Sequence, residues 1–96
     1  MGHVRITPLG LSGISVAGAI DAATAPAVVA AATSHGALVR LDLSGCTFMD
    51  SSGISALIEI HRHSIDGGGS LYLVDPSDAV TRVLIISGLM ATFNVE

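Results

Sequence analysis

The sequence predicts one α/β domain of 96 residues, in which helices pack on a single mixed β-sheet. Short apolar runs bounded by turn-forming residues alternate with longer runs in which apolar residues recur at helical spacing. Half of the residues are hydrophobic but only 3% are aromatic, so the core must be built from aliphatic side chains. Such a core is typical of buried strands that helices cover. The expected order of elements is β-β-α-β-α-β-α-β.

The N-terminal segment is expected to form a β-hairpin. Apolar and polar residues alternate over residues 3–7 and again over 11–17, which is the pattern of half-buried strands. One proline and two glycines within residues 8–13 supply the turn between the strands. We expect the chain to leave the sheet over residues 18–21.

An alanine-rich helix is predicted to follow the hairpin. Thr24 is its expected N-cap, because Pro26 then falls in the first turn, where the missing N–H is not needed. The run up to Thr33 has high helix propensity, and Gly36 is expected to end the helix. The apolar stretch over residues 38–43 is predicted to be the central strand.

A second helix is predicted over residues 52–65. A strand over 70–74, a third helix from the N-cap Ser77 to Gly88, and a short strand over 93–95 complete the fold. At 100° per residue, one stripe of the second helix is expected to pack on the sheet: Ile54, Leu57, Ile58, His61 and Ile65. The opposite side is expected to face solvent: Ser52, Ala56, Glu59, Ile60 and His63.

Charge and composition exclude several classes of function. The chain has four arginines, no lysine and a net charge of −4, so it lacks the basic cluster that nucleic acids require. No apolar run approaches a membrane span and no basic leader is present, so we expect no membrane insertion and a cytoplasmic location. No Cys/His spacing fits zinc, and no lysine-bearing phosphate loop occurs, so neither metal nor cofactor is expected. Cys46, the only cysteine, is predicted to be a small buried hydrophobe rather than a redox sensor.

Residues 42–54 form the most informative segment. They join the central strand to the second helix through a loop that carries Asp50, Ser51, Ser52 and Gly53 at its tip. Hydroxyls and free backbone N–H groups at the start of a helix favour an anion. The loop is therefore a place where a phosphate could be added or sensed.

Within this segment, the stretch Phe48-Met49-Asp50-Ser51-Ser52-Gly53-Ile54 resembles the STAS family, in particular the bacterial anti-sigma factor antagonists. Three further segments are similar to the family in the same order. They are residues 18–25 at the entry to the first helix, 42–45 in the central strand, and 87–89 at the end of the third helix. The resemblance implies that residues 1–96 form one STAS domain with the family's α/β fold.

The resemblance also implies a phosphorylation switch in which this chain performs no chemistry. In antagonists of this family the serine after the acid, here Ser51, is phosphorylated by an anti-sigma factor that is itself a serine kinase. The unphosphorylated form binds the anti-sigma factor and releases a sigma factor, and phosphorylation ends the binding. The predicted contact surface comprises Asp21, Asp50, Ser51, Ser52, Gly53, Ala56, Glu59 and Ile60. The oligomeric state is left open.

Three features depart from the family's pattern. Ala19 stands where many members have Glu, which removes an acidic group near the expected docking surface. Ser55 stands where a second small Gly is frequent. The chain ends at Glu96, about where the family usually adds one more helix, so that helix is expected to be absent.

Each residue of the loop also has a purely structural interpretation. A serine before an apolar run can cap a helix, and we predict that Ser52 has this role, which leaves Ser51 free to project. Asp50 could orient the Ser51 hydroxyl or simply match the helix dipole. Gly53 could allow a strand or a partner to approach closely, or it could be an ordinary first-turn glycine.

Two other functions are alternatives to antagonism. Similar domains also serve as cytoplasmic STAS components of membrane transport systems, which is the first alternative. The second is a hydrolase that uses Ser51 as its nucleophile. Because a serine nucleophile needs an adjacent base and His61 is predicted to face the core, the sequence disfavours the hydrolase.

Overall fold

Helices pack on a six-stranded mixed sheet in the computed structural model, which describes residues 3–10, 12–34, 36 and 39–96. In chain order its elements are β1 (Val4–Leu9), β2 (Gly13–Ile20), α1 (Ala25–Thr33), β3 (Val39–Asp42), β4 (Cys46–Met49), α2 (Ser51–Asp66), β5 (Leu71–Val74), α3 (Asp78–Ile86) and β6 (Asn94–Val95). The predicted α/β fold is confirmed, with one strand more than the sequence predicts.

Strand β2 connects the two parts of the sheet. The strand order is β1-β2-β3-β5-β6, with β1 antiparallel to β2 and the other neighbours parallel. Residues 13–15 of β2 pair with β3, and residues 18–20 pair with β4. Strands β3 and β4 therefore lie along the same edge of β2, one after the other.

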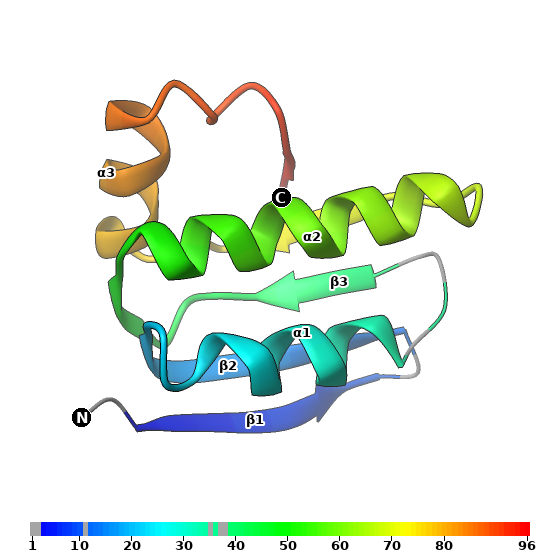
Figure 1. Ribbon diagram of the computed structural model, residues 1–96, viewed down its shortest axis with the longest axis horizontal. Helices are drawn as coiled ribbons and strands as arrows, with labels where there is room; N and C mark the ends of the chain where they lie inside the picture. Colours follow the sequence, from blue (N-terminus) through cyan, green and yellow to red (C-terminus); the bar gives the residue numbers. More distant parts are fainter. Residues whose placement is uncertain (1–2, 11, 35, 37–38) are drawn as a thin grey trace.

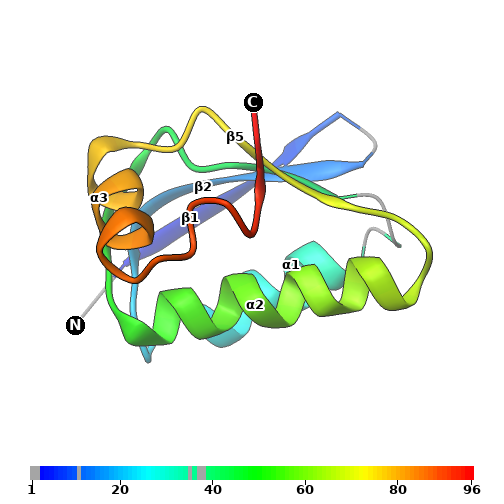
Figure 2. The same cartoon turned by 90° about the horizontal axis from the view of Figure 1, so that it is seen from above.

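The helices cover one face and one end of the sheet. Figure 1 shows α1 and α2 side by side in front of the sheet, and Figure 2 shows both on the same side of it. Helix α3 lies at the end where α2 begins, and it packs against β4. Because α1 follows β2 and α2 follows β4, and these strands are parallel, both helices begin at this same end.

The core between the sheet and the helices is aliphatic, as the composition predicts. Its largest fully buried side chains are Val16, Ile20, Val28, Val39, Leu41, Leu43, Leu57, Ile60, Leu71, Leu73, Val80 and Leu84. At its edge, the ring of His61 in α2 packs edge-to-face on Phe93, with ring centroids 5.4 Å apart. His61 is thus a packed histidine at the edge of the core, as predicted.

The predicted loop between the central strand and the second helix contains strand β4, so that prediction is wrong. Residues 18–20, which the sequence predicts to leave the sheet, stay in it because β4 pairs with them. Gly18 permits this arrangement, since its φ is +105° and a Cβ there would clash with the carbonyl oxygen of His3. A strand of four residues is too short to be recognised from alternation alone.

The buried face of helix α2 differs from the stripe that the sequence predicts. Leu57 is buried as predicted, but Ile65 is 56% exposed, whereas Ala56 and Ile60, predicted to face solvent, are buried. The helix packs against α1 as well as against β4 and β5, so its buried sector is wider than one stripe. Ile65 belongs to the last turn, which extends past strand β3 in Figure 1.

The predicted caps of α1 and α3 are found with one difference. Ser77 caps α3, because its Oγ accepts a hydrogen bond from the N–H of Val80. Thr24 precedes α1, but its hydroxyl does not cap the helix. The hydroxyl donates to the carbonyl of Ala19 (2.7 Å) and accepts from the N–H of Asp21 (3.0 Å), so it ties the start of α1 to the end of β2.

Cys46 is buried in β4, which agrees with the prediction of a structural thiol. Burial raises the pKa of this thiol, so the reactive thiolate is scarce at neutral pH. We expect a thiol reagent such as DTNB to label the native protein only as fast as it unfolds, and Cys46→Val to leave folding nearly intact. Rapid labelling of the native protein at neutral pH would contradict this structural role.

Candidate phosphorylation and partner-binding site

An aspartate caps the start of helix α2. Asp50 has an extended backbone (φ −117°, ψ −164°), and its Oδ1 accepts hydrogen bonds from the N–H groups of Ser52 (2.9 Å) and Gly53 (3.3 Å). This is the geometry of an N-cap. The prediction that Ser52 is the cap is wrong, because Ser52 already lies within the first turn and its own N–H is one of the groups that Asp50 satisfies.

Ser51 is the first residue of α2, and its side chain is exposed. Since Asp50 caps the helix, the Ser51 hydroxyl is not needed for that role and is accessible to another protein. The hydrolase interpretation finds no support in this arrangement. His61 lies ten residues further along α2, about 15 Å along the helix axis, and packs on Phe93.

Gly53 lies where α2 meets the ends of β2 and β4. A Cβ at this position would clash with the side chain of Met49 and would come within 3.1 Å of the carbonyl oxygen of Ile20. Of the alternatives that the sequence leaves open, the structure therefore selects close approach to a strand. The glycine lets the start of α2 pack directly on the strand ends.

A second turn, at the start of α1, lies at the same end of the molecule. The Oδ1 atom of Asp21 accepts hydrogen bonds from the N–H groups of Ala23 (2.9 Å) and Thr24 (3.1 Å), so this carboxylate shapes the turn. The next residue, Ala22, lines the same groove as Ser52 of α2. The two helix starts therefore form one continuous surface.

The groove between α1 and α2 has a volume of about 520 Å³. Its walls come from successive turns of the two helices, which lie side by side in Figure 1. The lining residues are Ala22, Ala25, Pro26, Val29 and Ala30 on the α1 side and Ser52, Ser55, Ala56 and Glu59 on the α2 side. Among the described residues that line this groove, Glu59 alone is charged.

Five of the eight predicted contact residues are accessible in the structure: Asp21, Asp50, Ser51, Ser52 and Glu59. The other three, Gly53, Ala56 and Ile60, are buried. Ala56 still reaches the floor of the groove, but Gly53 and Ile60 offer no accessible side chain to a partner. They are buried because α2 packs closely on the strand ends and on α1.

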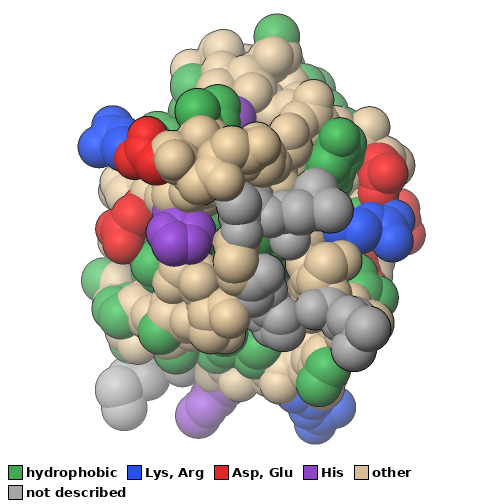
Figure 3. All heavy atoms as spheres, turned by 90° about the vertical axis from the view of Figure 1, so that its right-hand side faces the viewer, with side chains coloured by type: hydrophobic (Ala, Val, Ile, Leu, Met, Phe, Trp, Pro, Cys, Tyr) green, Lys and Arg blue, Asp and Glu red, His purple; other side chains and the backbone are tan. Residues whose placement is uncertain are grey.

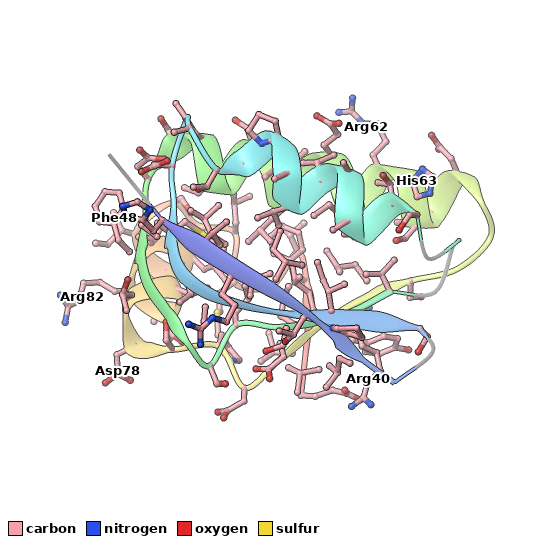
Figure 4. The ribbon with its side chains drawn as sticks, turned by 90° about the horizontal axis from the view of Figure 1, so that it is seen from below. Arg40, Phe48, Arg62, His63, Asp78 and Arg82 are labelled. Atoms are coloured by element: carbon pink, nitrogen blue, oxygen red, sulfur yellow. The ribbon has the colours of Figure 1, made fainter. Side chains whose placement is uncertain are left out.

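Phe48 in β4 is an exposed aromatic residue close to Ser51 in the sequence, and from the sequence it is identified only as part of the family motif. Its side chain is 50% exposed, three residues before Ser51. Figure 4 shows Phe48 at the left end of the molecule, whereas Arg62 and His63 lie to the right of the centre. Aromatic side chains are enriched among the residues that dominate protein interfaces. Recognition of strand β4 would have been needed to predict that this ring faces outward.

Asp42 holds the turn that leads into β4. Its Oδ1 accepts a hydrogen bond from the N–H of Ser44 (2.9 Å), and its Oδ2 accepts one from the hydroxyl of Ser15 (3.2 Å). These bonds, above all the one from the Ser44 backbone, lower the pKa of Asp42. Because the folded-state pKa is lowered, the resulting stability is present above the unfolded pKa and is lost as the pH falls through the folded pKa.

The described residues contain no group of three or more His, Cys, Asp or Glu side chains placed to hold a metal ion. In the same part of the chain, no helix is both long and apolar enough to cross a bilayer. The accessible features of the site are thus hydroxyls, carboxylates, one aromatic ring and an apolar groove. Such features suit binding to another protein.

Known proteins share both the sequence pattern and the fold. The family model described as "Mlab, STAS domain" matches residues 10–93. The chain belongs to the STAS domain family. An anti-sigma-B factor antagonist of Listeria monocytogenes is 35% identical to this STAS domain over 87 residues, which are 86% of this chain and 76% of the relative. The resemblance predicted from the sequence is confirmed.

Solved structures are also similar to this STAS domain, and two of them illustrate the likeness. An anti-sigma factor antagonist from Mycobacterium paratuberculosis has a TM-score of 0.77 at 26% identity, over 99% of this chain and 85% of that chain. The Bacillus cell fate determinant SpoIIAA in its phosphorylated form has a TM-score of 0.67 at 19% identity, over 98% of this chain and 91% of that chain. The second likeness shows the fold alone.

The cap at Asp50 leads to a stability prediction. Asp50→Ala should lower the free energy of unfolding by about 0.5–2 kcal/mol, because two N–H groups lose their acceptor. Asp50→Asn keeps an oxygen acceptor and should cost clearly less. Urea unfolding of both variants measures the difference. If both variants lost the same free energy of unfolding, Asp50 would stabilise the helix through its charge and not through its capping hydrogen bonds.

Proposed function

We propose that this STAS domain antagonises an anti-sigma factor by binding it, and that phosphorylation of Ser51 ends the binding. The observation that carries the proposal is the exposed Ser51 hydroxyl at the first position of α2, next to the capping Asp50. The Listeria monocytogenes relative is named an anti-sigma-B factor antagonist, and it is similar over 86% of this chain. The chain itself binds and is modified, while ATP, Mg²⁺ and the catalytic groups belong to the partner kinase.

A phosphate on Ser51 would change the charge of the site without requiring a new fold. Phosphoserine adds about −1.5 to −2 charges and three strong acceptors. The start of α2 tolerates an anion through the helix dipole, although Asp50 already accepts hydrogen bonds from the N–H groups of Ser52 and Gly53. The Asp50 carboxylate lies next to it, however, so the site becomes strongly negative. A partner that buries the neutral Ser51 hydroxyl would then have to bury two adjacent anions, which is costly.

The proposed contact surface runs along the accessible side chains at the start of the two helices. We place Ser51 and Ser52 at its centre, with the exposed Phe48 three residues before Ser51, Glu59 further along α2, and Asp21 in the turn before α1. The surface is continuous because the starts of α1 and α2 line one groove. The partner we propose is a cytoplasmic anti-sigma factor with serine kinase activity.

A reconstituted kinase reaction tests this function. The protein is incubated with its cognate anti-sigma factor, ATP and Mg²⁺, and mass spectrometry locates the phosphate. We expect phosphate on Ser51 in the wild-type protein and in Ser52→Ala, and none in Ser51→Ala. Phosphate on Ser52 alone, or a bound protein that is never phosphorylated, would overturn the switch.

A pull-down separates this function from the transport alternative. The unphosphorylated protein is immobilised, and the chains that it retains from native cell extract are identified by mass spectrometry. An anti-sigma factor among the retained chains supports antagonism. Retention of a membrane transport subunit, with no anti-sigma factor, would favour the alternative function.

A further inference from the structure

The groove between α1 and α2 continues well beyond the phosphorylation loop. Glu59 lines both this groove and a second hollow formed with Thr33, Arg62, His63 and Asp66. From Ser52 to Asp66 the α2 wall spans about 21 Å, at the helical rise of about 1.5 Å per residue. Figure 3 faces the end where this wall finishes, and charged and histidine side chains gather there on the side where the helices lie.

The half of the groove next to Ser51 combines an apolar lining with one carboxylate. Its α1 wall is made only of alanine, valine and proline side chains. Glu59 is exposed on the opposite wall, and within the described residues it forms no ion pair, since the pair found there joins Arg40 and Glu96. An exposed carboxylate beside an apolar wall leaves a charge that a basic partner group can match.

We infer that this groove receives an apolar segment of the anti-sigma factor that carries an arginine or lysine opposite Glu59. The inference rests on the proposed function. The groove opens at Ser52, beside the serine that the partner kinase must reach, so a bound kinase lies next to it. The apolar wall selects aliphatic side chains, and Glu59 selects a cation. A second copy of this chain is a poorer occupant, because it would set one acidic protein with a net charge of −4 against another.

The groove and the phosphorylation switch should act independently. Glu59 lies eight residues after Ser51, which is about 12 Å along α2. Substitutions at this separation with no shared partner usually have additive effects on free energy. The groove would therefore contribute the same binding free energy in both phosphorylation states, while the state of Ser51 decides whether the total is enough for the complex to form.

A matched pair of substitutions in α1 tests occupancy of the groove. Ala30→Glu places a charge on the apolar wall, and Ala27→Glu places the same charge on an exposed position of α1 outside the groove. Calorimetric titration with the cognate anti-sigma factor should show an affinity loss of about tenfold or more for Ala30→Glu, because the charge must be buried on binding. Ala27→Glu should bind like the wild-type protein.

The proposed pairing of the Glu59 carboxylate with a basic partner residue is tested by a separate substitution. Glu59→Gln should weaken binding by about two- to fivefold and make the affinity less sensitive to salt. Asp78→Asn, which neutralises an exposed carboxylate of α3 outside this groove, should change neither. If the affinity of Glu59→Gln depended on salt as strongly as that of the wild-type protein, the partner segment would not carry an arginine or lysine opposite Glu59.

The outcomes distinguish this inference from the proposed function. If the wild-type protein does not bind its cognate anti-sigma factor, the proposed function fails and the inference fails with it. If the wild-type protein binds and is phosphorylated on Ser51, but Ala30→Glu binds equally well, only the groove inference is overturned. Equal losses of affinity for Ala30→Glu and Ala27→Glu also overturn the groove inference. It is overturned as well if the protein self-associates in ultracentrifugation and Ala30→Glu abolishes this self-association without changing the affinity for the anti-sigma factor.

Discussion

Ile60→Ala is expected to lower the free energy of unfolding by about 2–5 kcal/mol. Ile60 is fully buried where α2 packs on the rest of the core, although its place in the apolar pattern predicts a solvent-facing side chain. Truncation removes apolar contacts and leaves a cavity that the close-packed surroundings fill only in part. Urea unfolding followed by circular dichroism measures the loss.

The matched control is Ile65→Ala in the same helix. Ile65 is 56% exposed, although the apolar pattern predicts that it faces the sheet. Because alanine has the higher helix propensity and little burial is lost, we expect the stability to change by less than about 0.5 kcal/mol. If the Ile65 variant were the less stable of the two, the orientation of α2 described above would be wrong.

Ser51→Asp should weaken binding to the anti-sigma factor by about 2–3 kcal/mol, which is roughly a 30- to 150-fold loss of affinity. The variant should fold normally, since an acidic side chain in the first turn of a helix interacts favourably with the helix dipole. The loss arises because two adjacent carboxylates, at positions 50 and 51, must be desolvated in the complex. Titration calorimetry against the cognate anti-sigma factor measures the affinity.

Two controls accompany this prediction. Ser51→Ala keeps a small neutral side chain, so it should bind about as well as the wild-type protein while it resists phosphorylation. Ser52→Asp adds the same charge one residue later, near the mouth of the groove, and should weaken binding less than Ser51→Asp. An affinity of Ser51→Asp equal to that of Ser51→Ala would mean that charge at this position does not control the complex.

Long, strongly patterned elements were predictable from the sequence. The second and third helices, the central strand and the Ser77 cap lie within a few residues of their predicted places. Each has a local cause, either an apolar period or a capping side chain, that operates whatever the rest of the chain does. The family resemblance was equally accessible, because its segments are contiguous in the sequence.

The features that could not be predicted depend on contacts between distant segments. Strand β4 is defined by its pairing with the end of β2, where the register shifts between Gly18 and Ala19, and no local pattern in four residues reveals that pairing. The burial of Ala56 and Ile60 depends on how α1 and α2 pack together. The exposure of Phe48 follows from β4, so it was missed together with the strand. At the site, the cap is Asp50 instead of the predicted Ser52, because the helix already begins at Ser51.

The most direct test of the proposed switch compares the phosphorylated and unphosphorylated forms of the wild-type protein in titration calorimetry against the cognate anti-sigma factor. Mass spectrometry first confirms a single phosphate on Ser51. Phosphoserine carries more charge and more acceptors than aspartate, so the phosphorylated form should bind more weakly than Ser51→Asp. Its affinity should be more than about 30-fold lower than that of the unphosphorylated protein. Equal affinity of the two forms would contradict the switch.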